Sequence, residues 1–143
     1  MSDRNSVEGV LFGQDPRLSV RLLSVSGVLF LVTFLLHTPS LFTRNAPLPF
    51  GFMLPVLWAV SFAPAAVGAY RNDGLFVSVA LASGPSLGFY LPLALFDLAY
   101  PSETLLWGLG AGVGYGVALG VLGFAVGAGG RRLVDRIRPA APA

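Results

Sequence analysis

The sequence contains no cysteine, no lysine and a single histidine among its 143 residues. The absence of cysteine excludes disulfide bonds, thiolate nucleophiles and cysteine-ligated metal clusters. Without lysine, the chain cannot form a Schiff base with a carbonyl compound such as retinal. One histidine, His37, cannot supply the paired axial ligands of a membrane haem. We therefore expect no cofactor, no metal site and no enzymatic activity in this chain alone.

Charged residues are also scarce. They make up 11% of the chain, whereas hydrophobic residues make up 55%. Soluble domains contain about 25% charged residues, so this composition is typical of an integral membrane protein. The length allows about four membrane-spanning helices of roughly 20 residues each. The predicted fold is an all-α membrane protein in the cell membrane, with the lipid bilayer as its surroundings.

Four apolar stretches give the predicted spans of a single antiparallel four-helix bundle. Asp15-Pro16 has the residue types of an N-cap and a first helical position, and Thr38-Pro39 ends the same helix. The sequence Arg71–Gly74 is a polar turn that joins the second and third spans as a hairpin. The predicted spans cover residues 16–36, 49–70, 75–98 and 102–129, and residues 131–143 form a basic, partly disordered cytoplasmic tail.

Two features of these spans have alternative explanations: a signal peptide for the first span, and a duplicated hairpin for a repeated sequence. The first apolar stretch resembles a signal peptide, but acidic residues precede it and no small-residue cleavage site follows it. We therefore interpret it as a retained span. The sequence Ala-Val-Gly-Ala occurs at both 66–69 and 125–128, near the ends of the second and fourth spans. Duplication of a hairpin explains this match, and so does chance similarity between apolar sequences.

The distribution of arginine predicts the orientation of the bundle. The N-terminal segment, the turn and the tail contain eight of the nine arginines: Arg4, Arg17, Arg21, Arg71, Arg131, Arg132, Arg136 and Arg138. The two loops on the opposite side contain only Arg44. Basic residues concentrate in cytoplasmic loops, so both termini are predicted to be cytoplasmic.

Glycine is concentrated in the fourth span. Ten of the eighteen glycines lie between Leu105 and Gly130. Within a membrane, glycine allows another helix backbone to approach closely. At 100° per residue, most of these glycines share one side of the helix. We call these helix-packing candidates the glycine face: Gly108, Gly112, Gly116, Gly120, Gly123 and Gly127.

A second strip of small residues lies nearly opposite the glycine face. It consists of Gly110, Gly114, Ala118 and Ala125. Two such surfaces predict a helix held between neighbours, within the bundle or across an oligomer. We therefore expect the fourth span to be the central or oligomerising helix. The alternative is a sliding or pore-lining helix whose smooth surface permits motion.

Ionisable residues within spans commonly indicate function, and this chain has few of them. His37 and Asp97 are predicted near the outer ends of the first and third spans, and Arg44 in the first outer loop. These three are weak polar-site candidates. Asp97 is expected at the interface, paired with Arg44, with a proton-relay or cation role as its alternative. Metal or haem ligation is the alternative role for His37.

Basic residues and prolines supply the remaining candidates. The tail arginines are expected to bind lipid headgroups: Arg131, Arg132, Arg136 and Arg138. Because no aromatic residues are interleaved with them, no nucleic-acid partner is expected. The prolines within the second and third spans predict static kinks, with a transport-related site as the alternative reading: Pro55, Pro64, Pro85 and Pro92.

These features favour a structural or accessory membrane subunit that packs against itself, as a homo-oligomer, or against a larger membrane partner. The alternative is a small transporter or channel for neutral or small solutes. The chain resembles small multidrug-resistance exporters in its length and number of spans. That family couples transport through a glutamate in its first span, whereas residues 18–36 here contain no acid.

Overall fold

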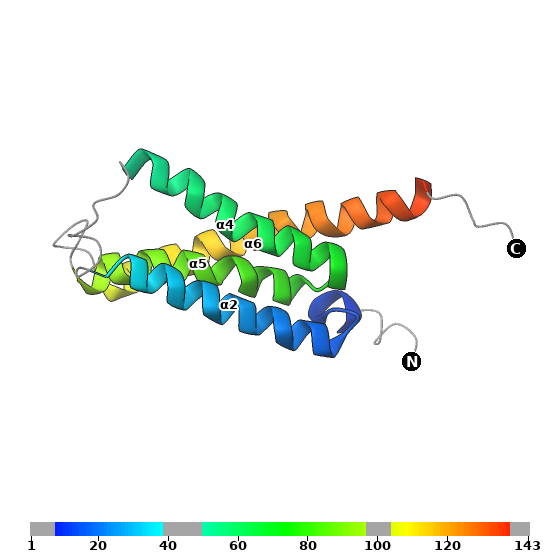
Figure 1. Ribbon diagram of the computed structural model, residues 1–143, viewed down its shortest axis with the longest axis horizontal. Helices are drawn as coiled ribbons and strands as arrows, with labels where there is room; N and C mark the ends of the chain where they lie inside the picture. Colours follow the sequence, from blue (N-terminus) through cyan, green and yellow to red (C-terminus); the bar gives the residue numbers. More distant parts are fainter. Residues whose placement is uncertain (1–7, 39–49, 97–103, 138–143) are drawn as a thin grey trace, which may run out of the picture.

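The computed structural model describes residues 8–38, 50–96 and 104–137, which form four long helices and no strand (Figure 1). Helix α2 spans Pro16–Leu36 and α4 spans Phe50–Asn72. Helix α5 spans Leu75–Leu95 and α6 spans Leu105–Ile137. A short helical turn at residues 8–12, called here the N-terminal turn, precedes α2. The prediction of an all-helical fold is confirmed for the described residues.

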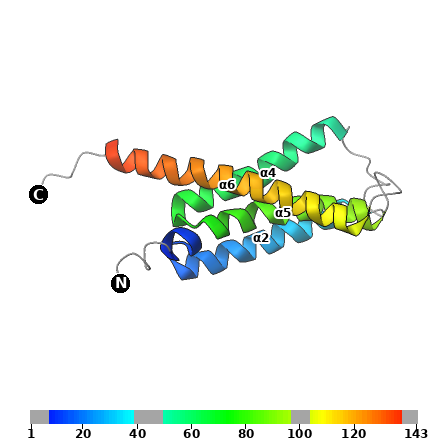
Figure 2. The same cartoon turned by 180° about the vertical axis from the view of Figure 1, so that it is seen from behind.

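Successive long helices run in opposite directions, so the beginning of α2, the α4–α5 turn and the end of α6 lie at the same end of the molecule (Figures 1 and 2). Helix α5 packs against α2, α4 and α6, whereas α2 barely touches α4. The central helix is therefore α5. The fourth span, α6, is predicted to be the central or oligomerising helix. Among the described residues it is not central, because only one of its sides packs there, and its oligomerising role stays a prediction.

The helix ends follow local sequence signals. The carboxylate of Asp15 accepts hydrogen bonds from the backbone N–H groups of Arg17 (2.9 Å) and Leu18 (3.4 Å), as an N-cap does. Helix α4 continues past its predicted end at residue 70 to Asn72, and α5 stops at Leu95, short of its predicted end at residue 98. Helix α6 runs without a break to Ile137. Residues 131–137, predicted as part of the basic tail, thus prolong the fourth helix.

Among the described residues, three segments are long and apolar enough to cross a membrane: Glu8–Leu36, Leu75–Leu95 and Leu105–Ile137. Helix α4 is not among them, although it is 23 residues long. Large apolar side chains are exposed along the outer sides of these segments, including Val28, Leu31 and Leu35 on α2. Soluble monomers rarely expose extended apolar surfaces of this kind. The helices therefore indicate membrane association.

The charges of the described residues are all gathered at one end of the bundle. Six arginines and four acids lie there: Arg17, Arg21, Arg71, Arg131, Arg132, Arg136, Glu8, Asp15, Asp73 and Asp135. We call this the charged end; it includes the start of α2, the α4–α5 turn and the end of α6 (Figure 1). The described helices beyond it contain no charged residue. An uncharged shaft with one charged end suits a helix bundle embedded in lipid.

Candidate functional site

The structure places the glycine face of α6 against two neighbouring helices. All six glycines of this face are buried. A Cβ atom added at Gly116 would lie 2.6 Å from the Cα of Ser83, and one at Gly120 would lie 2.5 Å from the Cα of Val79. Real Cβ atoms essentially never approach other heavy atoms this closely. Only glycine, whose side chain is a single hydrogen atom, fits where the backbones of α6 and α5 cross.

The same face moves from α5 to α4 along the length of α6. A Cβ atom at Gly112 would contact Leu87 of α5, whereas one at Gly123 would lie 2.8 Å from the Cβ of Ala65 in α4. Gly127 approaches the carbonyl oxygen of Ala66. Small residues on α4 therefore meet small residues on α6. The glycine face lies against both helices within one chain.

The second strip of α6 lies on the molecular surface. Gly110, Gly114, Ala118 and Ala125 are all exposed. Nothing lies within 4 Å of a Cβ atom added at Gly110 or Gly114. The two small-residue surfaces of α6 thus have different surroundings. One is filled by α5 and α4, and the other has no neighbour within the described part of the chain.

The contact between α5 and α2 uses two glycines that were not among the sequence candidates. A Cβ atom at Gly84 would lie 2.5 Å from the carbonyl oxygen of Ser26, and one at Gly88 would lie 2.6 Å from that of Phe30. The hydroxyl of Ser26 also donates a hydrogen bond of 2.5 Å to the carbonyl of Ala80. Gly84 and Gly88 have the G-x-x-x-G spacing typical of close helix packing in membranes. This spacing is the signal by which they could have been identified.

At the charged end, Asn72 connects three segments that are distant in sequence. Its side chain is fully buried. Its carbonyl oxygen accepts a hydrogen bond from the backbone N–H of Gln14, and its Oδ1 accepts one from that of Asp15, both at 2.9 Å. Its Nδ2 donates to the Ser19 hydroxyl at 2.7 Å. Asn72 thereby joins the end of α4 to the segment before α2 and to α2 itself.

Backbone conformation at two positions makes this network fit. Gly13 has φ +95°, and a Cβ atom there would lie 2.6 Å from the Cγ of Asn72. Asp73, which begins the turn into α5, has φ +53°, in the left-handed region that non-glycine residues rarely adopt. Gly74 lies directly against Gly13. The predicted polar turn is therefore packed against the N-terminal segment.

The end of α6 is joined to the same network. Arg131 donates a hydrogen bond from Nη2 to Oε1 of Gln14 at 3.2 Å, and its Nε lies 3.9 Å from Oδ2 of Asp135. Arg132 forms an ion pair with Asp73 at 3.6 Å. Two of the four arginines expected at lipid headgroups thus contact protein groups. Arg136 is exposed, and Arg138 lies outside the described residues.

The Arg132–Asp73 ion pair should contribute little to stability. The Arg132 side chain is 62% exposed, and surface ion pairs are worth about 0–1 kcal/mol. We expect R132Q to lower the free energy of unfolding by less than about 1 kcal/mol. Thermal unfolding in detergent at low and high salt measures this. A large loss of stability would show that the pair is a principal support of the charged end.

Of the three polar candidates, only His37 lies among the described residues. His37 follows the last turn of α2, where its Nδ1 lies 2.7 Å from the carbonyl of Thr33 and its ring meets the edge of Phe89. Arg44 and Asp97 lie outside the described residues, so their pairing stays a prediction. In the described ranges, no three acidic or histidine side chains are grouped so that they could hold a metal ion.

Comparison of the chain with protein-family models, with curated proteins and with solved structures finds no match. The function of the chain is therefore inferred from the physical properties of its structure. They are the apolar helices, the exposed second strip of α6 and the charged end, each built from residues that the structure describes.

Proposed function

We propose that the protein is a four-span integral membrane protein with a structural role, and that it packs through the second strip of α6 against another membrane helix. That helix belongs to a second copy of the chain or to a larger membrane partner. Helix α4, at 23 residues, supplies the fourth span. Both termini lie on the arginine-rich side, which the positive-inside rule makes cytoplasmic.

The observation that supports this role is the open space beside Gly110 and Gly114. Lipid chains are as apolar as leucine, so helices associate in a membrane mainly where small residues allow close contact. The exposed side of α2 presents bulky residues such as Val28 and Leu31, which suit contact with lipid. The second strip of α6 has the composition of a helix-contact surface instead.

The substitution G114L tests the strip directly. Purified in a mild detergent, the native protein should run as an oligomer or with a companion protein, as native mass spectrometry will show. We expect G114L to release single chains, because a leucine side chain holds the neighbouring helix away. The melting temperature of the single chain should change little, since Gly114 has open space beside it.

The matched control is V126L, which also enlarges an exposed residue of α6 but lies outside the strip. It should leave the assembly intact. If the native protein runs as a monomer without any companion, the proposed structural role is wrong. If G114L and V126L weaken assembly equally, the contact does not use the second strip.

A further inference from the structure

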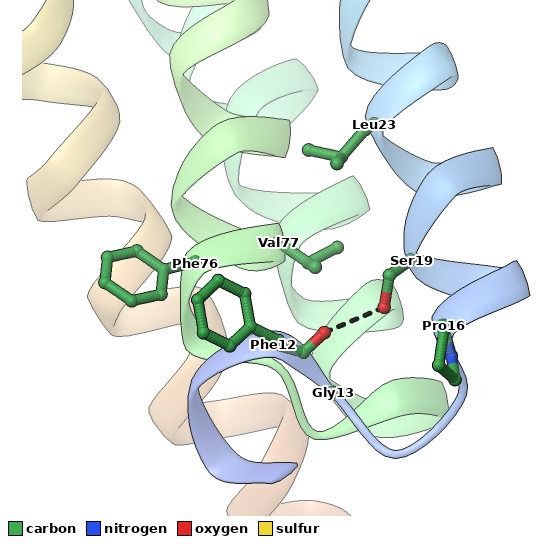
Figure 3. A pocket seen from close by; sticks show the side chains of 7 residues that line it. All are labelled: Phe12, Gly13, Pro16, Ser19, Leu23, Phe76 and Val77. Atoms are coloured by element: carbon green, nitrogen blue, oxygen red, sulfur yellow. Dashed lines mark hydrogen bonds between the residues drawn. The ribbon is translucent and has the colours of Figure 1, made fainter. Parts of the chain in front are cut away.

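A groove of about 280 Å³ lies at the charged end, between the N-terminal turn, α2 and α5 (Figure 3). Its floor contains the buried side chains of Ser19 and Val77. Phe12 and Phe76 form one wall, with ring centroids 5.4 Å apart, and Leu23 lies further along α2. Phe12 and Phe76 are each more than half exposed, so the groove opens to the surroundings of the bundle.

The groove offers an apolar surface without a free polar group in its floor. Ser19 is its one hydroxyl-bearing residue, and this hydroxyl lies 2.8 Å from the carbonyl of Phe12, to which it donates (Figure 3). It also accepts the hydrogen bond from Asn72. A polar ligand would find no partner there. An apolar ligand would lose nothing by displacing water from this surface.

The direction of the groove matches that of a lipid chain. Its lining on α2 extends from Pro16 to Leu23, about 10 Å along the helix axis at 1.5 Å per residue. It begins at the charged end and continues into the uncharged shaft. In a bilayer, a chain entering at the headgroup level follows the same course.

Positive charge lies beside the Gly13 side of the groove, at the charged end of the bundle. Gly13, which lines the groove, is followed by Gln14, and Arg131 is hydrogen-bonded to the side chain of Gln14. The guanidinium of Arg131 is also ion-paired, with its Nε 3.9 Å from Oδ2 of Asp135, and its buried Nη1 has no acceptor among the described residues. Asp15 is engaged as the N-cap of α2, Asp73 is paired with Arg132 and Asp135 is paired with Arg131. The six arginines and four acids of the charged end still leave it with a net charge of +2.

From these observations, we infer that the groove binds one acyl chain of an anionic phospholipid of the bilayer, with the headgroup on the side of Arg131. This inference depends on the membrane-spanning arrangement proposed above. It adds a defined lipid site beside the helix-contact surface that we propose for the second strip of α6. Each basic residue near an anionic headgroup contributes about 1 kcal/mol, which corresponds to a preference of about fivefold.

Photocrosslinking in nanodiscs tests the site. The probes are phosphatidylglycerol and phosphatidylcholine that carry the same diazirine-labelled acyl chain, and labelled residues are mapped by mass spectrometry. We expect phosphatidylglycerol to label Phe12, Leu23 and Phe76 more strongly than it labels Val28, which is exposed elsewhere on α2. Phosphatidylcholine should label the groove about fivefold less than phosphatidylglycerol does.

Three variants separate the parts of the inference. L23W places a larger side chain in the groove and should reduce labelling there, whereas the control V28W should not. R131Q should reduce the preference for phosphatidylglycerol and keep the labelling by both probes. Labelling of the groove no stronger than that of Val28 would overturn the lipid site, and so would crosslinks that show a second copy of the chain in the groove.

The same experiment distinguishes failure of this inference from failure of the proposed function. If the probes label α2 and α6 broadly but do not favour the groove, the chain is embedded in the bilayer and only the lipid site is wrong. If no residue of the described helices is labelled, the membrane-spanning arrangement is wrong as well. The oligomer measured with G114L does not depend on the groove, because Gly114 is not part of it.

Discussion

Replacing Gly116 with leucine is expected to prevent the bundle from folding. A Cβ atom at this position already lies 2.6 Å from the Cα of Ser83, and it also meets the Ser83 hydroxyl. Because backbone atoms cannot move aside as a flexible side chain can, α6 would have to separate from α5. Overpacking of a well-packed core typically costs 1–3 kcal/mol, and we expect about 3 kcal/mol or more here.

The measurement for G116L is thermal unfolding in detergent together with the elution volume on gel filtration. G116A should fall between the native chain and G116L, because it introduces the Cβ atom alone. G114L is the matched control for thermal unfolding, since it places the same side chain on the same helix where nothing lies within 4 Å. V126L, which should leave the assembly intact, is the control for the elution volume. A G116L protein that keeps the native melting temperature and elution volume would contradict the packing of α6 on α5 described here.

Replacing Asn72 with alanine is expected to have the second largest effect. Its side chain is fully buried and bonds both the Asp15 N–H and the Ser19 hydroxyl. Each buried polar group that loses its partner costs about 1–3 kcal/mol, so we expect N72A to lose about 2–4 kcal/mol. The segment before α2 should also become accessible to protease, because Asn72 holds it against the turn.

Limited proteolysis and thermal unfolding measure the effect of N72A. The control is Q14A, which removes an exposed side chain and its bond to Arg131 but keeps the backbone N–H that bonds Asn72. Q14A should cost less than about 1 kcal/mol. If N72A is as stable and as resistant to protease as Q14A, the network around Asn72 does not hold the charged end together.

Much of the fold follows from local signals in the sequence. The Asp15-Pro16 pair and the polar turn at residues 71–74 predict where α2 begins and where the hairpin reverses, because capping and turn formation depend on neighbouring residues. Helical periodicity likewise places the glycines of α6 on one side. These effects act over a few residues, so a single sequence contains them.

The pairing of helices does not follow in this way. Periodicity shows that α6 has a small-residue surface but does not identify which helix covers it, and α5 rather than α6 occupies the centre. Asn72 looks like an ordinary residue of an exposed turn, yet it is fully buried by segments more than 50 positions away. Contacts between distant segments decide both features. The contact of the second strip of α6 with another helix, and the side of the membrane on which the termini lie, remain predictions.

The length of α6 has a mechanical consequence. Its 33 residues extend about 50 Å at 1.5 Å per residue, whereas the hydrocarbon core of a bilayer is about 30 Å thick. Because the helix continues unbroken to Ile137, its last turns form a rigid arm that projects from the charged end (Figure 1). In the membrane-spanning arrangement proposed above, a small tilt of α6 would therefore move the tip of this arm further than the rest of the helix. If α6 repacked against a neighbouring helix, the tip of this arm would be displaced outside the membrane.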